Sequence, residues 1–227
     1  MVNSDGQGSG SDQYSTLSAE HRNELEVKRS RFITVLRRVE TEDDARSLVA
    51  DLRKEFHDAR HHCSAFIIGA DRTVQRSNDD GEPSGTAGAP MLEALVRRGT
   101  AAGVADLSDV CAVVVRYFGG ILLGAGGLVR AYSDSVSSAL QTAPLVQRRL
   151  MQLFTIELAH DQAGRLENEL RADGIQIVSN DYSVSGVELT VALPAGEPAA
   201  GFPHRLASLT GGRSRPEPSG CRWTDLS

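Results

Sequence analysis

Residues 110–132 read VCAVVVRYFGGILLGAGGLVRAY, and this stretch decides the fold of the first half of the chain. The run from Val110 to Phe118 is almost continuously apolar, which is typical of a strand buried on both faces of a sheet. Five glycines lie within residues 119–127, and they permit tight turns and close backbone packing. Apolar residues then recur at helical spacing to Leu140. The sequence therefore predicts a strand, a glycine-rich loop and a helix in succession.

The residues before this stretch alternate between strand and helix patterns. Thr41 is the expected N-cap of a helix, because Asp43 and Asp44 fall in its first turn, where carboxylates favour the helix dipole. Pro90 suits the first turn of another helix, which ends near Gly99. The expected elements are a strand at 26–39, a helix at 42–57, short strands at 63–69 and 73–77, and a helix from 90.

The residues after 143 show a second pattern. Ala143-Pro144 ends the preceding helix and marks a domain boundary. We expect strands at 146–158, 175–183, 186–193 and weakly at 221–224, with helices at 161–173 and 199–209. This βαββαβ order is the signature of a ferredoxin-like domain. The predicted fold class is α+β, with a tail at 1–16, a first domain at 17–143 and a second at 144–227.

Composition limits the classes of protein to consider. A chain of 227 residues, 40% of them hydrophobic, is long enough for two domains. No apolar run approaches the roughly 20 residues of a membrane-spanning helix, and no secretory signal is evident. The three cysteines, Cys63, Cys111 and Cys221, are too widely spaced for a disulfide framework or a zinc site. These features predict a cytoplasmic protein without membrane contact.

The formal net charge of −6 means that any contact with nucleic acid must be local. A basic cluster occurs near the N-terminus, but glutamates are interleaved with part of it, so we favour a solvated strand over a nucleic-acid site. The cluster consists of Arg22, Lys28, Arg29, Arg31, Arg37 and Arg38.

Residues 77–90, SNDDGEPSGTAGAP, form the first loop with candidate chemistry. The N–H groups of Gly85–Gly88 would lie at a helix N-terminus and suit an anion, and Ser84 and Thr86 add hydroxyls. Three carboxylates in the same loop would repel that anion unless Arg116 or Arg130 offsets them. The alternative is that these arginines simply hold the acidic loop, without any ligand. The carboxylates are those of Asp79, Asp80 and Glu82.

The glycine-rich loop after residue 118 does not match a nucleotide-binding motif. It lacks the Gly-Lys-Ser/Thr of a P-loop and the third glycine of a dinucleotide-binding fingerprint. Gly119 and Gly120 are therefore expected to serve backbone packing. Tyr117, Phe118 and Tyr132 offer faces on which bases could stack, although a role in the core is the commoner one for such aromatics.

His61 and Cys63 lie on one face of an extended segment and form a conceivable nucleophilic pair. No group that would orient them can be placed from the sequence. The alternative, which we favour, is a buried cysteine beside a histidine at a strand end.

Several of these stretches together resemble the YigZ/IMPACT family, in particular its bacterial two-domain branch. The resemblance implies a first domain similar to the fourth domain of elongation factor G, a β-α-β sandwich like those of ribosomal proteins. It implies a second domain similar to the ferredoxin-like fifth domain, and hence a layout that faces RNA or the ribosome. The sequence departs from the family at Leu122 and Ala89, where lysines are common. The matching stretches are 28–32, 61–66, 79–88, 116–120 and 124–132.

The function that we predict is a non-catalytic protein that binds RNA or the ribosome, or a translation-related protein partner, and regulates translation without a cofactor. One alternative is a hydrolase of phosphorylated or peptide-like small substrates, in which the acidic loop holds Mg²⁺. Another is a protein-interaction module that docks through the second domain. The predicted ligand-binding residues are Asp79, Asp80, Glu82, Ser84, Gly85, Thr86, Gly88, Arg116, Tyr117, Gly119, Gly120 and Arg130, with His61, Cys63, Arg29 and Arg31 as secondary candidates.

Overall fold

The apolar run of the sequence forms β6 (Val110–Tyr117), the central strand of a five-stranded antiparallel sheet. The computed structural model describes residues 12–100 and 104–226, and these divide into a unit that ends at Gln147 and a second unit, Arg148–Leu226. The sheet of the first unit has the order β2-β3-β6-β4-β5. The other strands are β2 (His21–Val27), β3 (Ser30–Arg38), β4 (His61–Ile68) and β5 (Val74–Asn78).

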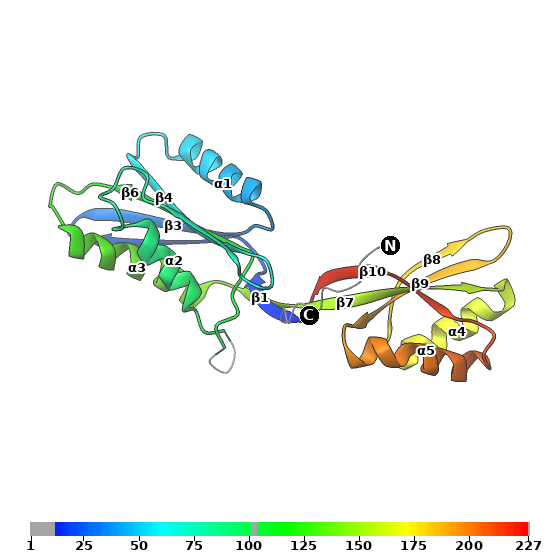
Figure 1. Ribbon diagram of the computed structural model, residues 1–227. Helices are drawn as coiled ribbons and strands as arrows, with labels where there is room; N and C mark the ends of the chain where they lie inside the picture. Colours follow the sequence, from blue (N-terminus) through cyan, green and yellow to red (C-terminus); the bar gives the residue numbers. More distant parts are fainter. Residues whose placement is uncertain (1–11, 101–103, 227) are drawn as a thin grey trace, which may run out of the picture. The chain divides into compact units, whose positions relative to one another are not determined.

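Helices cover both faces of this sheet (Figure 1). Helix α1 (Glu42–Glu55) packs on one face, and α2 (Gly88–Val96) and α3 (Ala125–Thr142) pack on the other. Successive side chains of β6 therefore enter two different cores, which explains why the strand is apolar along its length. Thr41 caps α1 as expected, with its Oγ1 accepting the N–H of Asp44 at 3.1 Å.

The first half differs from the sequence prediction at residues 26–39, where the structure has a hairpin instead of one strand. Val27 pairs with Ser30, so Lys28 and Arg29 form a two-residue turn. Both turn residues have positive φ, 48° and 65°. Two-residue turns of this kind favour Asn-Gly. Because this turn contains neither asparagine nor glycine, the sequence pattern did not indicate it.

The structure also differs from the expected tail at residues 13–16. Residues 1–11 lie outside the described part, but β1 (Gln13–Leu17) is ordered into the first unit. Tyr14 is buried and its hydroxyl donates to the Asp109 carboxylate, while Thr16 Oγ1 donates to the Asp109 carbonyl at 3.1 Å. These long-range contacts, which local composition cannot reveal, correct the prediction for residues 13–16.

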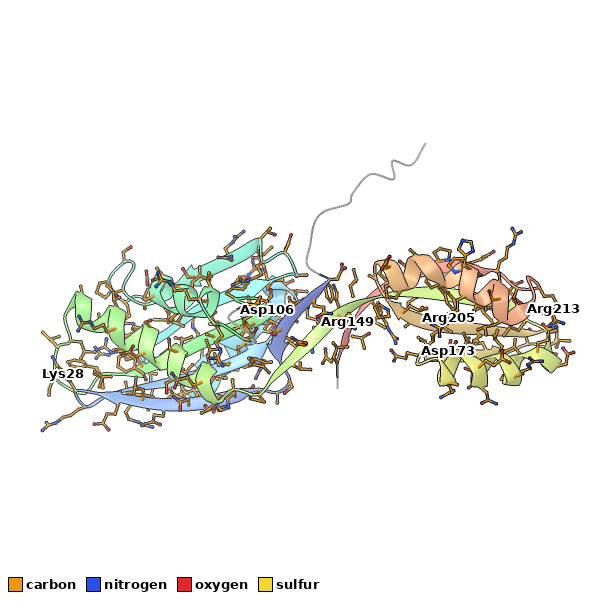
Figure 2. The ribbon with its side chains drawn as sticks, turned by 90° about the horizontal axis from the view of Figure 1, so that it is seen from below. Lys28, Asp106, Arg149, Asp173, Arg205 and Arg213 are labelled. Carbon is orange, nitrogen blue, oxygen red and sulfur yellow. The ribbon has the colours of Figure 1, made fainter. Side chains whose placement is uncertain are left out.

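The second unit has the predicted ferredoxin-like order, and its helices share a core with one face of the sheet. Within this unit β7 pairs with both β10 and β9, and β9 pairs with β8, each pair being antiparallel. Arg205 and Asp173 form a surface ion pair of 2.7 Å (Figure 2). The elements are β7 (Leu145–Leu158), α4 (His160–Ala172), β8 (Gln176–Tyr182), β9 (Val187–Pro194), α5 (Glu197–Thr210) and β10 (Pro216–Asp225).

The last strand is longer than its sequence pattern indicated. β10 begins at Pro216 and bends at a register shift between Pro218 and Gly220. Proline and glycine weaken the strand pattern but are tolerated at a sheet edge or bulge. Among the residues described, none of the helices is both long and apolar enough to cross a membrane.

Candidate functional site

Antiparallel pairing brings three connections to one end of the first sheet. Arg116, near the end of β6, pairs with Phe32 at the start of β3 and with His61 at the start of β4. Asn78, the last residue of β5, pairs with Ser64 of β4. The β2–β3 turn, the acidic loop after β5 and the glycine-rich loop after β6 therefore occupy the same end of the unit.

The glycine-rich loop lies directly against the β2–β3 turn. The N–H of Gly119 donates to Ser30 Oγ at 3.1 Å. A Cβ atom at residue 119 would lie 2.1 Å from the carbonyl carbon and oxygen of Arg29. Only glycine permits this approach without moving the backbone. The contact fixes Lys28 and Arg29 beside the loop.

The exposed residues of the turn and loop form one mixed surface, which we call the tip surface and define as Lys28, Arg29, Phe118, Ile121 and Leu122. Phe118 is 52% exposed and Leu122 is 83% exposed. Lys28 projects from the turn at the end of the unit (Figure 2). Both cations are exposed and have no ion-pair partner in the described part of the chain.

Arg130 lies in the second turn of α3, which begins after this loop, and is also exposed. Like the two cations of the tip surface, it has no ion-pair partner within residues 12–100 and 104–226. The other arginines of the N-terminal basic cluster are paired, which agrees with the solvated-strand interpretation for that part. The pairs are Arg22–Glu55 at 2.5 Å, Arg31–Glu24 at 2.7 Å, Arg37–Glu20 at 2.6 Å and Arg38–Glu40 at 2.9 Å.

Asp79 caps the N-terminus of α2. Its carboxylate accepts the N–H groups of Gly85 at 2.8 Å, Ala87 at 3.0 Å and Gly88 at 2.8 Å. Burial opposes ionisation of Asp79, but these three hydrogen bonds outweigh it and lower the pKa of the carboxyl. An external anion would have to displace Asp79 to reach these N–H groups.

Asp80 joins the acidic loop to α1 and β4. One carboxylate oxygen accepts from Arg53 at 2.5 Å and the other from the backbone N–H of His62 at 2.6 Å. The Asp80 carbonyl lies 2.9 Å from Nδ1 of His61. Arg53 did not emerge from the sequence as a partner of this loop.

Glu82 is buried in a hydrogen-bonded network behind the tip surface. Its Oε1 accepts from Arg116 at 2.6 Å and from the Tyr132 hydroxyl at 2.8 Å. Arg116 is only 7% exposed. Its guanidinium carbon lies 5.5 Å from the ring centre of Phe32 and 5.7 Å from that of Phe118. Arg116 therefore supports Phe118 of the tip surface from below.

Cys63 belongs to the same network. Its thiol lies 3.0 Å from the Asp79 carbonyl and 3.3 Å from the Tyr132 hydroxyl. Burial raises the pKa of the thiol to about 12. The side chain stays a neutral thiol at physiological pH, a form that is a poor nucleophile.

The remaining predicted residues have local roles or face solvent. The Tyr117 hydroxyl donates to Asp58 at 2.7 Å, and Thr86 Oγ1 donates to the Pro83 carbonyl at 2.6 Å. Ser84 and Gly120 are exposed. In the part of the chain that is described, no three His, Cys, Asp or Glu side chains converge in a way that could hold a metal ion.

Comparisons with known proteins show which family contains the segments at this end of the sheet. Residues 28–140 match the Impact N-terminal domain, and residues 156–213 match a domain of unknown function, DUF1949. The IMPACT family member YvyE of Bacillus subtilis (strain 168) is 42% identical over 88% of each chain. The chain belongs to the IMPACT family.

Other IMPACT family proteins agree with this assignment. The IMPACT family member YigZ of Escherichia coli (strain K12) is 41% identical over 82% of this chain and 88% of its own length. A solved structure described as the crystal structure of an hypothetical protein is 36% identical, with a TM-score of 0.63. That similarity covers 92% of this chain and 98% of the other. In this IMPACT protein the Impact domain match spans both the β2–β3 turn and the two loops.

Proposed function

We propose that this protein is a non-catalytic binder of RNA or the ribosome that acts in the regulation of translation. The observation that carries the proposal is the Lys28-Arg29 turn, whose two exposed cations lie against the glycine-rich loop that bears Phe118, Ile121 and Leu122. Unpaired cations attract phosphates, and exposed aromatic or aliphatic side chains contact unstacked bases or protein surfaces. The tip surface combines both kinds of group.

The backbone of the turn strengthens this proposal. Lysine and arginine at positive φ are less favourable than asparagine and glycine by about 1 kcal/mol or more per residue. Strained backbone that persists in a fold is a pointer to function. We interpret Lys28 and Arg29 as residues kept for their charge at the expense of turn stability.

The acidic loop supports binding rather than metal-assisted hydrolysis. Asp79 accepts backbone N–H groups, Asp80 pairs with Arg53, and Glu82 pairs with Arg116. Each carboxylate is thus directed to a different protein partner. The role that these contacts support is to hold the loops and the tip surface in place.

The test is RNA binding as a function of salt. Fluorescence anisotropy would compare wild type with the double variant Lys28→Asn, Arg29→Gly, using a labelled single-stranded RNA. Each lost phosphate contact reduces the slope of log affinity against log salt by about 0.7, so two lost contacts reduce it by about 1.4. The charge-matched control, Arg97→Gln with Arg165→Gln, removes two exposed cations elsewhere and should leave the slope unchanged. Equal slopes for all three proteins would refute the assignment of the tip surface.

A further inference from the structure

A groove of about 630 Å³ lies beside the edge strand β5, on the sheet face that carries α1. It exists because α1 packs mainly over β4 and β6, toward the middle of the sheet. Residues of α1 form one wall, β4 and β6 contribute the floor, and β5 forms the other wall. Small-molecule sites commonly have volumes of about 300–1,000 Å³, so the groove is large enough for a small ligand.

Val49 of α1 and Phe66 of β4 give the groove an apolar patch. Val49 and Phe66 are half-buried, so part of each side chain remains open to the groove. Phe66 is the direct cross-strand partner of both Cys111 and Arg76, which places these three residues on the same face of the sheet. Burial raises the pKa of the Cys111 thiol to about 12, so the floor carries no negative charge near neutral pH.

The walls carry three arginines, of which two are held by close ion pairs. Arg46, Arg53 and Arg76 line the groove against a single carboxylate, that of Glu42. Arg53 is engaged with Asp80 at 2.5 Å, and Arg46 with Asp43 at 2.7 Å and Glu42 at 3.1 Å. Arg76 reaches Glu42 only at 3.9 Å, and its side chain is 61% exposed. The Arg76 guanidinium is therefore the most available of the three for a ligand, because its existing ion pair is long and solvated.

We infer that the groove binds a small amphipathic anion, with an apolar or aromatic body on Val49 and Phe66 and a carboxylate, sulfonate or phosphate held by Arg76. An apolar floor with a few convergent polar groups is the usual composition of a ligand site. A guanidinium can hold such an anion through two parallel hydrogen bonds. This site goes beyond the proposed RNA or ribosome binding, because it lies on the α1 face rather than at the tip surface.

The test uses anilinonaphthalene sulfonate, an aromatic anion whose fluorescence rises when it leaves water. Ala50 is exposed on the groove wall, so Ala50→Trp should obstruct the groove without disturbing the core. Arg76→Gln keeps a polar side chain at this position but removes its charge. Two controls change positions away from the groove: Arg97→Gln removes an exposed arginine on α2, and Leu122→Ser removes an apolar side chain of the tip surface.

We expect wild type to bind the probe saturably with one site. Arg76→Gln should bind it about tenfold more weakly, which corresponds to one charge-assisted hydrogen bond, and Ala50→Trp should also bind it more weakly because the indole ring obstructs the groove. The Arg97 and Leu122 variants should match wild type. Circular dichroism would first show that all five proteins are folded. Absence of saturable binding, unchanged binding by Ala50→Trp, or a loss of binding confined to a control variant would each overturn the inference.

Discussion

Glu82 connects the acidic loop to the centre of the first domain. Its carboxylate is almost fully buried and shared between the Arg116 guanidinium and the Tyr132 hydroxyl. Removing one partner of a buried ion pair leaves the other charge unpaired in a medium of low polarity. The pair is therefore expected to matter more for stability than any of the surface pairs of this chain.

Glu82→Gln should destabilise the protein by about 3–5 kcal/mol, because it leaves the Arg116 charge uncompensated. Urea denaturation followed by circular dichroism measures this loss. The double variant Glu82→Gln, Arg116→Met should recover a large part of it, since it removes both charges and keeps apolar volume next to Phe32. If the loss of stability in the double variant equalled the sum of the losses in Glu82→Gln and Arg116→Met, the pairing would be contradicted.

Asp79 gives the stability a specific dependence on pH. Its pKa in the folded state is lowered below the ordinary 3.8, so its contribution is complete above that value and is lost as pH falls through the folded-state pKa. Wild type should lose more stability than Asp79→Asn between about pH 5 and 2, while at pH 7 the variant should be weaker by about 1 kcal/mol for the altered cap. Thermal unfolding of both proteins across this pH range measures the difference. If the stabilities of wild type and Asp79→Asn fell in parallel with pH, the capping role of the Asp79 carboxylate would be contradicted.

Some of these residue contacts follow from the sequence and others do not. The sequence left open whether arginines hold the acidic loop, and it offered Arg116 as one of two candidates; the structure pairs Arg116 with Glu82. Arg53 was missed because it lies 27 residues before Asp80, on the exposed side of a helix, where nothing local distinguishes it from other arginines. Such long-range pairs depend on how α1 packs, which the pattern of one segment does not specify.

At the scale of elements, helices and strands with a strongly periodic sequence pattern were predictable. The buried strand β6, the capped helix α1 and the βαββαβ order of the second domain all have clear periodicity or capping residues. Strand β2 was missed because its exposed positions are Arg22, Glu24 and Glu26, so that its alternation is mostly polar. An edge strand paired on one side only does not need a stronger apolar pattern.

The residues of the β2–β3 turn are expected to lower the stability of the hairpin. Lys28→Asn with Arg29→Gly should stabilise the protein by about 1–2 kcal/mol, because both new residues adopt positive φ more easily. For a chain of this size the midpoint of thermal unfolding should rise by a few degrees. Differential scanning calorimetry measures the change. An unchanged or lower midpoint would show that the turn is not strained.

The chain as a whole carries a net charge of −6, which opposes long-range attraction to RNA. Most cations of the first domain are paired with nearby carboxylates, and Lys28, Arg29 and Arg130 are among those without an ion-pair partner in the described residues. The proposed RNA-binding surface is thus a small attractive area on an acidic protein. Binding through so few cations should be weak in salt and readily reversible.

The central claim is that the tip surface recruits this IMPACT protein to the ribosome or its RNA. The most direct measurement is co-sedimentation of the full chain with purified bacterial ribosomes at low and moderate salt, comparing wild type with Lys28→Asn, Arg29→Gly. We predict salt-sensitive co-sedimentation of wild type and its loss in the variant, even though the variant is the more stable protein. Failure of the folded wild type to co-sediment at low salt, or equal binding by the variant, would contradict the claim.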